Sequence, residues 1–249
     1  MSRISTGLNR MVVAAALLAA NGLSVSAAAS AEDSPAAILQ RTRTTYAALS
    51  SYSDSGTVIV DLSASAQDRH TFTTLFKRAP RHFLFDFRKQ GDDRYVVWGD
   101  PDAFHTWWKE IDQQSDYPNP QNIDAINLSD FQTAGSVNKI AMLLYPKASL
   151  VGALTHFADA ALDGTEDVGG QRCFRLVGRT SDLYGATGKE VNIRKLTLWI
   201  DAKTALVRQI REEAKAAPGL MNRMTTTYVP VANPTLADGQ FTFAPPASQ

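Results

Sequence analysis

The chain has 249 residues, with 25 basic and 25 acidic side chains and a single cysteine. This balance provides no excess positive charge for binding nucleic acid, and one cysteine excludes an internal disulfide. A hydrophobic core must therefore hold the fold together.

The N-terminal segment has the order of a secretory signal. Two arginines precede an apolar run over residues 11–20, and small residues then lead to an Ala-Ser-Ala site at 29–31. The alternative is a membrane anchor, which needs about 20 continuous apolar residues, but polar residues interrupt this run from Asn21 onward. We therefore expect cleavage of residues 1–31, and one domain at 32–249 with a net charge of −2, free in the periplasm without a lipid anchor.

A helix is predicted at residues 35–49. Ser34 is a suitable N-cap, and proline follows it at the first helical position. One helical face carries Leu39, Thr42, Tyr46 and Leu49. Residues 50–56 are rich in turn formers and predict a loop before the pattern changes from helical to alternating.

Apolar residues then alternate with polar ones, as in antiparallel strands with one apolar face. Turns are predicted at residues 91–93 and 99–102. The alternating positions are Val58, Val60, Leu62, Phe72, Phe76, Phe83, Phe85, Phe87, Tyr95, Val97, Phe104, Thr106 and Trp108.

Two short helices are predicted between residues 136 and 157, where helical spacing returns. Their apolar stripes include Ile140, Leu144, Leu150 and Leu154, with Pro146 between the two helices. Strand patterns resume at 173–177, 191–200, 206–213, 224–229 and 241–243, with a hairpin connection at 201–205. This order predicts an α+β fold with helices gathered on one side of an antiparallel sheet.

The residues provide little evidence for catalysis. A Ser-x-x-Lys pattern at 136–139 is followed by Ser-Asp-Leu at 181–183 and Lys-Thr-Ala at 203–205, which imitate the motifs of penicillin-interacting serine enzymes. Leucine replaces asparagine in the second motif and alanine replaces glycine in the third, so we expect no enzyme. Cys173 is interpreted as a small buried hydrophobic residue.

No cofactor or metal site is predicted, because the histidines have no ligand spacing. They are His70, His82, His105 and His156.

The apolar face carries more large side chains than one sheet needs for its own pleat. They are Phe72, Phe76, Phe83, Phe85, Phe87, Tyr95, Phe104, Trp108, Leu196, Leu198 and Ile200. One interpretation is an ordinary core closed by three helices. The other is a cavity for an acyl chain or another apolar ligand, under a lid formed by the middle helices. Burying each methylene contributes about 0.8 kcal/mol, so such a cavity could hold a long chain without charged contacts.

Four stretches, in order along the chain, resemble the periplasmic lipoprotein carriers of the LolA-like family and their uncharacterised relatives. The first is Lys77-Arg78-Ala79-Pro80-Arg81-His82-Phe83, similar to the basic-Pro-aromatic strand junction of the carriers. The others are residues 163–174, Leu198-Trp199-Ile200-Asp201 with the following Leu206-Val207-Arg208, and the closing Phe-Thr-Phe-Ala-Pro-Pro at 241–246.

The resemblance implies a curved antiparallel sheet forming an incomplete barrel, with an N-terminal helix and a helical lid over an apolar cavity. It also implies a non-enzymatic carrier of lipoprotein acyl chains or other lipids, expected to be a monomer, with membrane-bound donor or acceptor proteins as further partners. A sensory or interaction module on the same fold, like the envelope-stress regulators, is the alternative.

In the carriers, the arginine of the junction hydrogen-bonds to the lid and holds it shut. Here Ala79 separates Arg78 from Pro80, so Arg81 competes with Arg78 for this role, and a solvated strand-end arginine is the alternative for either. The chain is also longer than a typical carrier around residues 113–133 and 178–190.

Overall fold

The structure is a computed structural model that describes residues 33–61, 63, 66–117, 140, 143–145, 157–184, 189–214 and 222–246. The helical elements are α1 (Pro35–Ala48), η2 (Lys109–Ile111) and η8 (Asp238–Phe241). The strands are β1 (Ser51–Asp61), β2 (Gln67–Lys77), β3 (His82–Arg88), β4 (Arg94–Gly99), β5 (Phe104–Trp108), β6 (Gln113–Tyr117), β7 (Ala158–Val168), β8 (Gln171–Tyr184), β9 (Lys189–Asp201), β10 (Val207–Ala214), β11 (Asn222–Tyr228) and β12 (Val231–Ala232).

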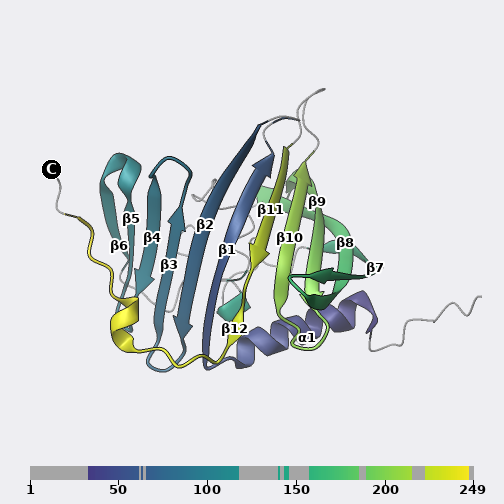
Figure 1. Cartoon of the computed structure of the whole chain (residues 1–249), viewed down its shortest axis with the longest axis horizontal. Coiled ribbons are helices and arrows are strands. Elements are labelled where there is room, and N and C mark those ends of the chain that lie inside the picture. Colours follow the sequence, from purple (N-terminus) through teal and green to yellow (C-terminus); the bar gives the residue numbers. More distant parts are fainter. Residues whose placement is uncertain are drawn as a thin grey trace, which may run out of the picture.

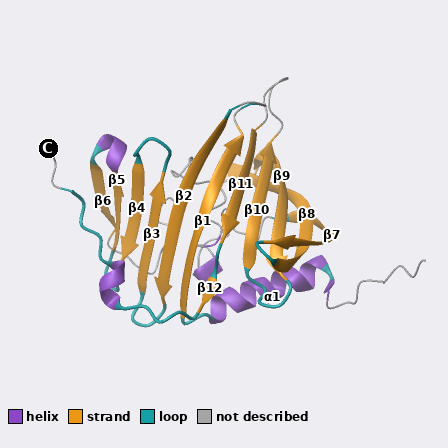
Figure 2. Ribbon diagram, in the orientation of Figure 1, coloured by secondary structure: helices purple, strands orange, loops and turns teal. Residues whose placement is uncertain are grey.

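All described strands belong to one antiparallel sheet (Figures 1 and 2). The strand order is β6-β5-β4-β3-β2-β1-β11-β10-β9-β8-β7, with β12 paired to β1. The sheet is open, because its two outermost strands do not pair with each other. This architecture confirms the predicted antiparallel sheet with an N-terminal helix.

One face of the sheet carries the core and is called the inner face below. Directly opposed residues of antiparallel strands point to the same side, so the register defines a row across the centre of the sheet. The row consists of His70, Val58, Thr226, Ile210, Leu198 and Leu176. All six are buried. The opposite side is called the outer face.

Helix α1 covers one end of the inner face and runs across the lower ends of β1, β11, β10 and β9 (Figure 1). It begins as predicted, because the Ser34 hydroxyl accepts a hydrogen bond from the Ala37 N–H at 3.2 Å. Thr42 and Tyr46 are fully buried, as the helical spacing indicated.

Two elements differ from the sequence-based expectation. The predicted loop at 50–56 is instead the first half of β1, because it pairs with β2 on one side and with β12 on the other. The predicted strand at 241–243 is wrong. Residue 241 ends η8, and the next residues are held by side-chain packing.

Strands β6, β7 and β12 were not predicted. Strand β7 lacks large alternating side chains, and its register shifts twice against β8, so it has no regular period-2 signal.

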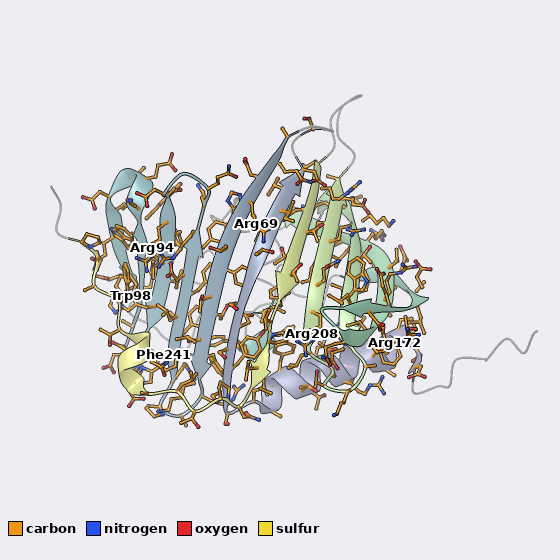
Figure 3. The ribbon with its side chains drawn as sticks, in the orientation of Figure 1. Arg69, Arg94, Trp98, Arg172, Arg208 and Phe241 are labelled. Carbon is orange, nitrogen blue, oxygen red and sulfur yellow. The ribbon has the colours of Figure 1, made fainter. Side chains whose placement is uncertain are left out.

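The C-terminal segment packs on the outer face near β4 and β5. The Phe243 ring lies 5.1 Å from Trp98 and 5.5 Å from Trp107 between ring centroids, and the Arg94 guanidinium lies 5.0 Å from its centre. Figure 3 labels Arg94 and Trp98 on this side of the sheet. The segment that follows β11 and β12 in the chain therefore packs against β4 and β5, on the other side of β1 in the sheet.

We expect Phe243→Ala to lower the free energy of unfolding by about 1 to 2 kcal/mol, because it removes two aromatic contacts and one cation–π contact. Urea denaturation followed by circular dichroism measures this loss. Thr242→Ala is the control, because that side chain is exposed and next to the same anchor. An equal loss in both variants would show that the Phe243 contacts contribute nothing specific.

Candidate functional site

All eleven residues predicted to line the apolar face lie on the inner face. The register places Phe76, Phe83 and Phe104 at one end of the strands, and places Phe87, Tyr95 and Trp108 toward the other. Nine of the eleven are buried, and Tyr95 and Trp108 are half-buried. Leu196, Leu198 and Ile200 continue the same face on β9.

The inner face also contains residues that the sequence reasoning did not select. Ile210, Leu176 and Tyr228 are buried in the same core cluster. Each lies in a predicted strand, but none was assigned to the apolar face from the sequence. Their positions follow from pairing with β9 and β1, which joins the two halves of the sheet into one apolar surface.

Of the four predicted lid residues, Ile140 and Leu144 are described, and both are helical and buried in the core cluster. Leu150 and Leu154 lie outside the described residues. Tyr145, next to Leu144, has its ring 5.4 Å from Phe76 between centroids. Ile140 and residues 143–145 therefore pack onto the β2–β3 part of the inner face.

Arg78 connects this segment to α1. Its Nε donates to the Leu49 carbonyl at 2.7 Å, and its Nη2 donates to the carbonyls of Tyr46 at 3.2 Å and Leu144 at 3.3 Å. Burial lowers the pKa of the guanidinium from its usual value. Arg81 instead lies with its guanidinium 6.0 Å from the Tyr145 ring centre. The two candidate arginines thus contact the same segment in different ways.

A buried polar chain lies beneath α1. The Tyr52 hydroxyl donates to Asp54 Oδ2 at 2.7 Å, and the Tyr46 hydroxyl accepts from the Val207 N–H at 3.2 Å. The two tyrosine rings are 5.5 Å apart between centroids. These contacts tie the helix to β1 and β10.

Asp54 is the acidic member of this chain. Desolvation by burial raises the pKa of its carboxyl to about 6, although hydrogen bonds from Thr74 and Tyr52 favour the charged form. No described residue is a hydrogen-bond partner of its Oδ1. The sequence did not indicate this group, since Asp54 lies in a stretch that resembles a turn.

The three patterns that resemble motifs of serine enzymes do not form a catalytic site among the described residues. Ser136 and Lys139 lie outside the described residues. Ser181 is buried in β8, whereas Lys203 lies in the turn after β9. Cys173 of β8 pairs with Asp201, next to that turn. Ser181 lies eight residues further along β8, which is about 25 Å at the rise of a strand, so Ser181 is far from the turn that carries Lys203.

Cys173 is not activated as a nucleophile. Burial raises the pKa of the Cys173 thiol to about 11, so it stays protonated at neutral pH. Among the described residues, no group of three or more His, Cys, Asp or Glu side chains could hold a metal ion. His156 lies outside the part of the chain that is described.

The outer face carries a hollow of about 360 Å³ that the sequence did not suggest. It is lined by Ser55, Gly56, Thr57, Thr71, Phe72, Thr73, Asp86, Arg88 and Val229.

The described helices include none long and apolar enough to cross a membrane.

No protein-family model matches the chain, and no curated protein matches it. Solved structures with a similar arrangement include the lipoprotein LppX of Mycobacterium tuberculosis, at 11% identity and a TM-score of 0.44, with 78% of this chain and 93% of that chain covered. MucB in the MucA/MucB complex of Pseudomonas aeruginosa is similar at 14% identity and a TM-score of 0.45, over 84% of this chain and 61% of that chain. A third is from Nitrosomonas europaea. It is the LolA superfamily protein NE2245, at 10% identity and a TM-score of 0.34, with 84% of this chain and 98% of that chain covered.

Proposed function

We propose that this chain is a non-enzymatic periplasmic carrier or binding protein whose inner face takes the acyl chains of a lipoprotein or another lipid. The observation that supports it is the continuous apolar inner face, which crosses both halves of the sheet beneath two separate covers. One cover is α1 and the other consists of Ile140 and residues 143–145. A surface of this kind holds a ligand through burial of hydrocarbon and needs few polar contacts.

The sequence motifs agree with this proposal. The stretch at 77–83 resembles the junction of the carriers, and in the structure it supplies the arginine that bridges both covers. Lipoproteins or free lipids are the proposed cargo, and membrane-bound donor and acceptor proteins are the proposed partners.

Native mass spectrometry of the protein purified gently from periplasm tests this function. We expect acylated species to co-purify, and we expect delipidated protein to take up stearic acid. Arg88→Ala, a change at an exposed outer-face position of β3, should leave the uptake unchanged. A spectrum of protein alone, together with no uptake after delipidation, would contradict the proposal. Recovery of one stoichiometric protein partner without lipid would support the interaction module instead.

We further propose that Arg78, rather than Arg81, holds the cover that contains Leu144 closed against α1, because Arg78 donates hydrogen bonds both to α1 and to Leu144. In Arg78→Ala, amide hydrogen exchange at residues 143–145 should become about tenfold faster or more, since each hydrogen bond from a charged group contributes about 1.5 to 3 kcal/mol. Arg81→Ala is the comparison variant. It removes the contact with the Tyr145 ring and should accelerate exchange less than Arg78→Ala does. Faster exchange in Arg81→Ala alone would show that Arg81, and not Arg78, holds this cover closed.

A further inference from the structure

The inner face changes in polarity along the strands. The central row that contains Val58 is apolar except for His70 at its β2 end and Thr226 on β11. The next row away from α1 consists of Asp68, Val60, Met224, Glu212, Leu196 and Gly178. Beyond it, Arg194 Nε donates to Glu212 Oε2 at 2.9 Å. Apart from the buried Tyr52–Asp54 pair, the face therefore runs from an apolar end beneath α1 to an end that carries charged groups.

His70 lies further from α1 than Asp54 and is the titratable side chain of the central row. It is 8% exposed, and its ring packs 5.5 Å from Phe87 between centroids. Its Nδ1 accepts a hydrogen bond from the Gln90 N–H at 3.2 Å. A backbone N–H can only donate, so the Nδ1 lone pair must be free of a proton and a neutral ring must carry its proton on Nε2.

Two features keep this donor in place. Desolvation lowers the pKa of His70, with Lys89 acting in the same direction and Asp68 opposing it, so the ring stays neutral at pH 7. The contact with Gln90 fixes the ring orientation. Within the described part of the chain, no residue accepts a hydrogen bond from Nε2, which leaves this N–H available to a ligand.

The distance from α1 to this point suits an acyl chain. Tyr52 packs against Tyr46 of α1, and Val58, the β1 partner of His70, lies six residues further along the strand. Six residues of a strand span about 20 Å. The acyl chains of one membrane leaflet span about 15 Å, half of the bilayer hydrocarbon core.

We propose that an acyl ligand lies along the inner face with its hydrocarbon chain toward α1, and that the His70 Nε2–H donates to an acceptor oxygen next to that chain. The ligand class is an amphiphile with a carboxylate or an ester carbonyl at the head of the chain. This inference rests on the proposed function and adds to it an orientation and a polar contact.

Orientation is tested with two spin-labelled fatty acids and backbone amide NMR signals. With 5-doxylstearic acid, whose nitroxide is near the carboxylate, we expect broadening at His70, Gln90 and Glu212. With 16-doxylstearic acid, whose nitroxide is near the chain end, we expect broadening at Tyr46 and Tyr52. The reversed pattern, or one independent of label position, would overturn the inference while leaving lipid binding intact. No broadening with either label would show that the proposed function itself fails.

The polar contact is tested by titrating stearic acid and 1-stearoylglycerol into His70→Phe, which keeps an aromatic ring against Phe87 but has no donor. We expect about fivefold to tenfold weaker binding of at least one of them, as one hydrogen bond contributes. A loss with stearic acid alone identifies a carboxylate acceptor, and a loss with both identifies the carbonyl oxygen that they share.

Two variants make the measurement specific to the hydrogen bond. His70→Gln retains a side-chain donor and should keep most of the affinity. His82→Phe makes the same chemical change on the outer face, where His82 stacks on Phe241, and should bind like the native protein. Unchanged affinity of His70→Phe for both ligands would overturn the polar contact.

Discussion

Phe87→Ala is expected to lower the free energy of unfolding by about 3 to 5 kcal/mol, the range for deleting a fully buried phenylalanine. Phe87 is 0% exposed and lies on the inner face near the end of β3. Its ring is 6.2 Å from Phe85 and 5.5 Å from His70 between centroids, so truncation leaves a void with rigid aromatic walls. Urea denaturation measures the loss, with the m-value as a check that two-state unfolding is retained.

The neighbouring residue provides the control. Arg88 points to the outer face, where its side chain is 57% exposed and pairs with Asp86. Arg88→Ala should change the free energy of unfolding by less than about 1 kcal/mol, as for other exposed ion pairs. Similar losses in both variants would mean that the inner face is no better packed than the surface.

Binding must be separated from stability in these experiments. Phe87→Leu keeps most of the buried volume and should retain the fold at room temperature. If the inner face holds acyl chains, stearic acid should bind more weakly to folded Phe87→Leu than to Arg88→Ala. Equal affinity in the two folded variants would place the ligand elsewhere.

Asp54→Asn is expected to stabilise the protein at neutral pH. Burial raises the carboxyl pKa in the folded protein from 3.8 to about 6, so the folded state holds this proton more tightly than the unfolded chain does. The stabilising effect of protonation is complete below pH 3.8 and is lost as the pH rises through about 6. Above pH 6 the native protein therefore carries an unfavourable buried charge that asparagine does not.

The free energy difference between the two proteins should grow by about 2 to 3 kcal/mol between pH 4 and pH 8, since one pKa unit corresponds to 1.36 kcal/mol. Urea denaturation at a series of pH values measures it. Carboxylates with a lowered pKa, such as Asp93 and Asp201, contribute stability that is lost as the pH falls. They are present in both proteins, so their contributions cancel in the difference. Parallel pH curves for the two proteins would show that Asp54 ionises as easily in the fold as in water.

Several features could be predicted from the sequence because their signals are local. Ser34 and Pro35 mark the start of α1, and the alternating phenylalanines of 83–87 mark a strand with one apolar face. The hairpin at 201–205 is similarly local, because the Asp201 carboxylate accepts from the Lys203 and Thr204 N–H groups at 2.9 Å. In each case the residues that determine the structure are within a few positions of one another.

The first half of β1 shows where local signals fail. Serine, aspartate and glycine favour turns when considered alone, yet residues 51–56 form a strand between β2 and β12. Tyr52 donates to the Asp54 Oδ2, and Asn233, far along the chain, accepts a hydrogen bond from the Ser50 N–H at 2.9 Å. Partners separated by up to 183 residues therefore override the turn preference.

By itself the sequence determined the apolar inner face, because a period of two places every second side chain on the same side of a strand. Only the tertiary structure decided which polar groups share that face. Asp54 is buried because α1 folds across β1, and Arg78 contacts Leu144 because the junction at 77–83 meets the end of α1. Such contacts join segments that are distant in sequence, and no periodicity within one segment can specify them.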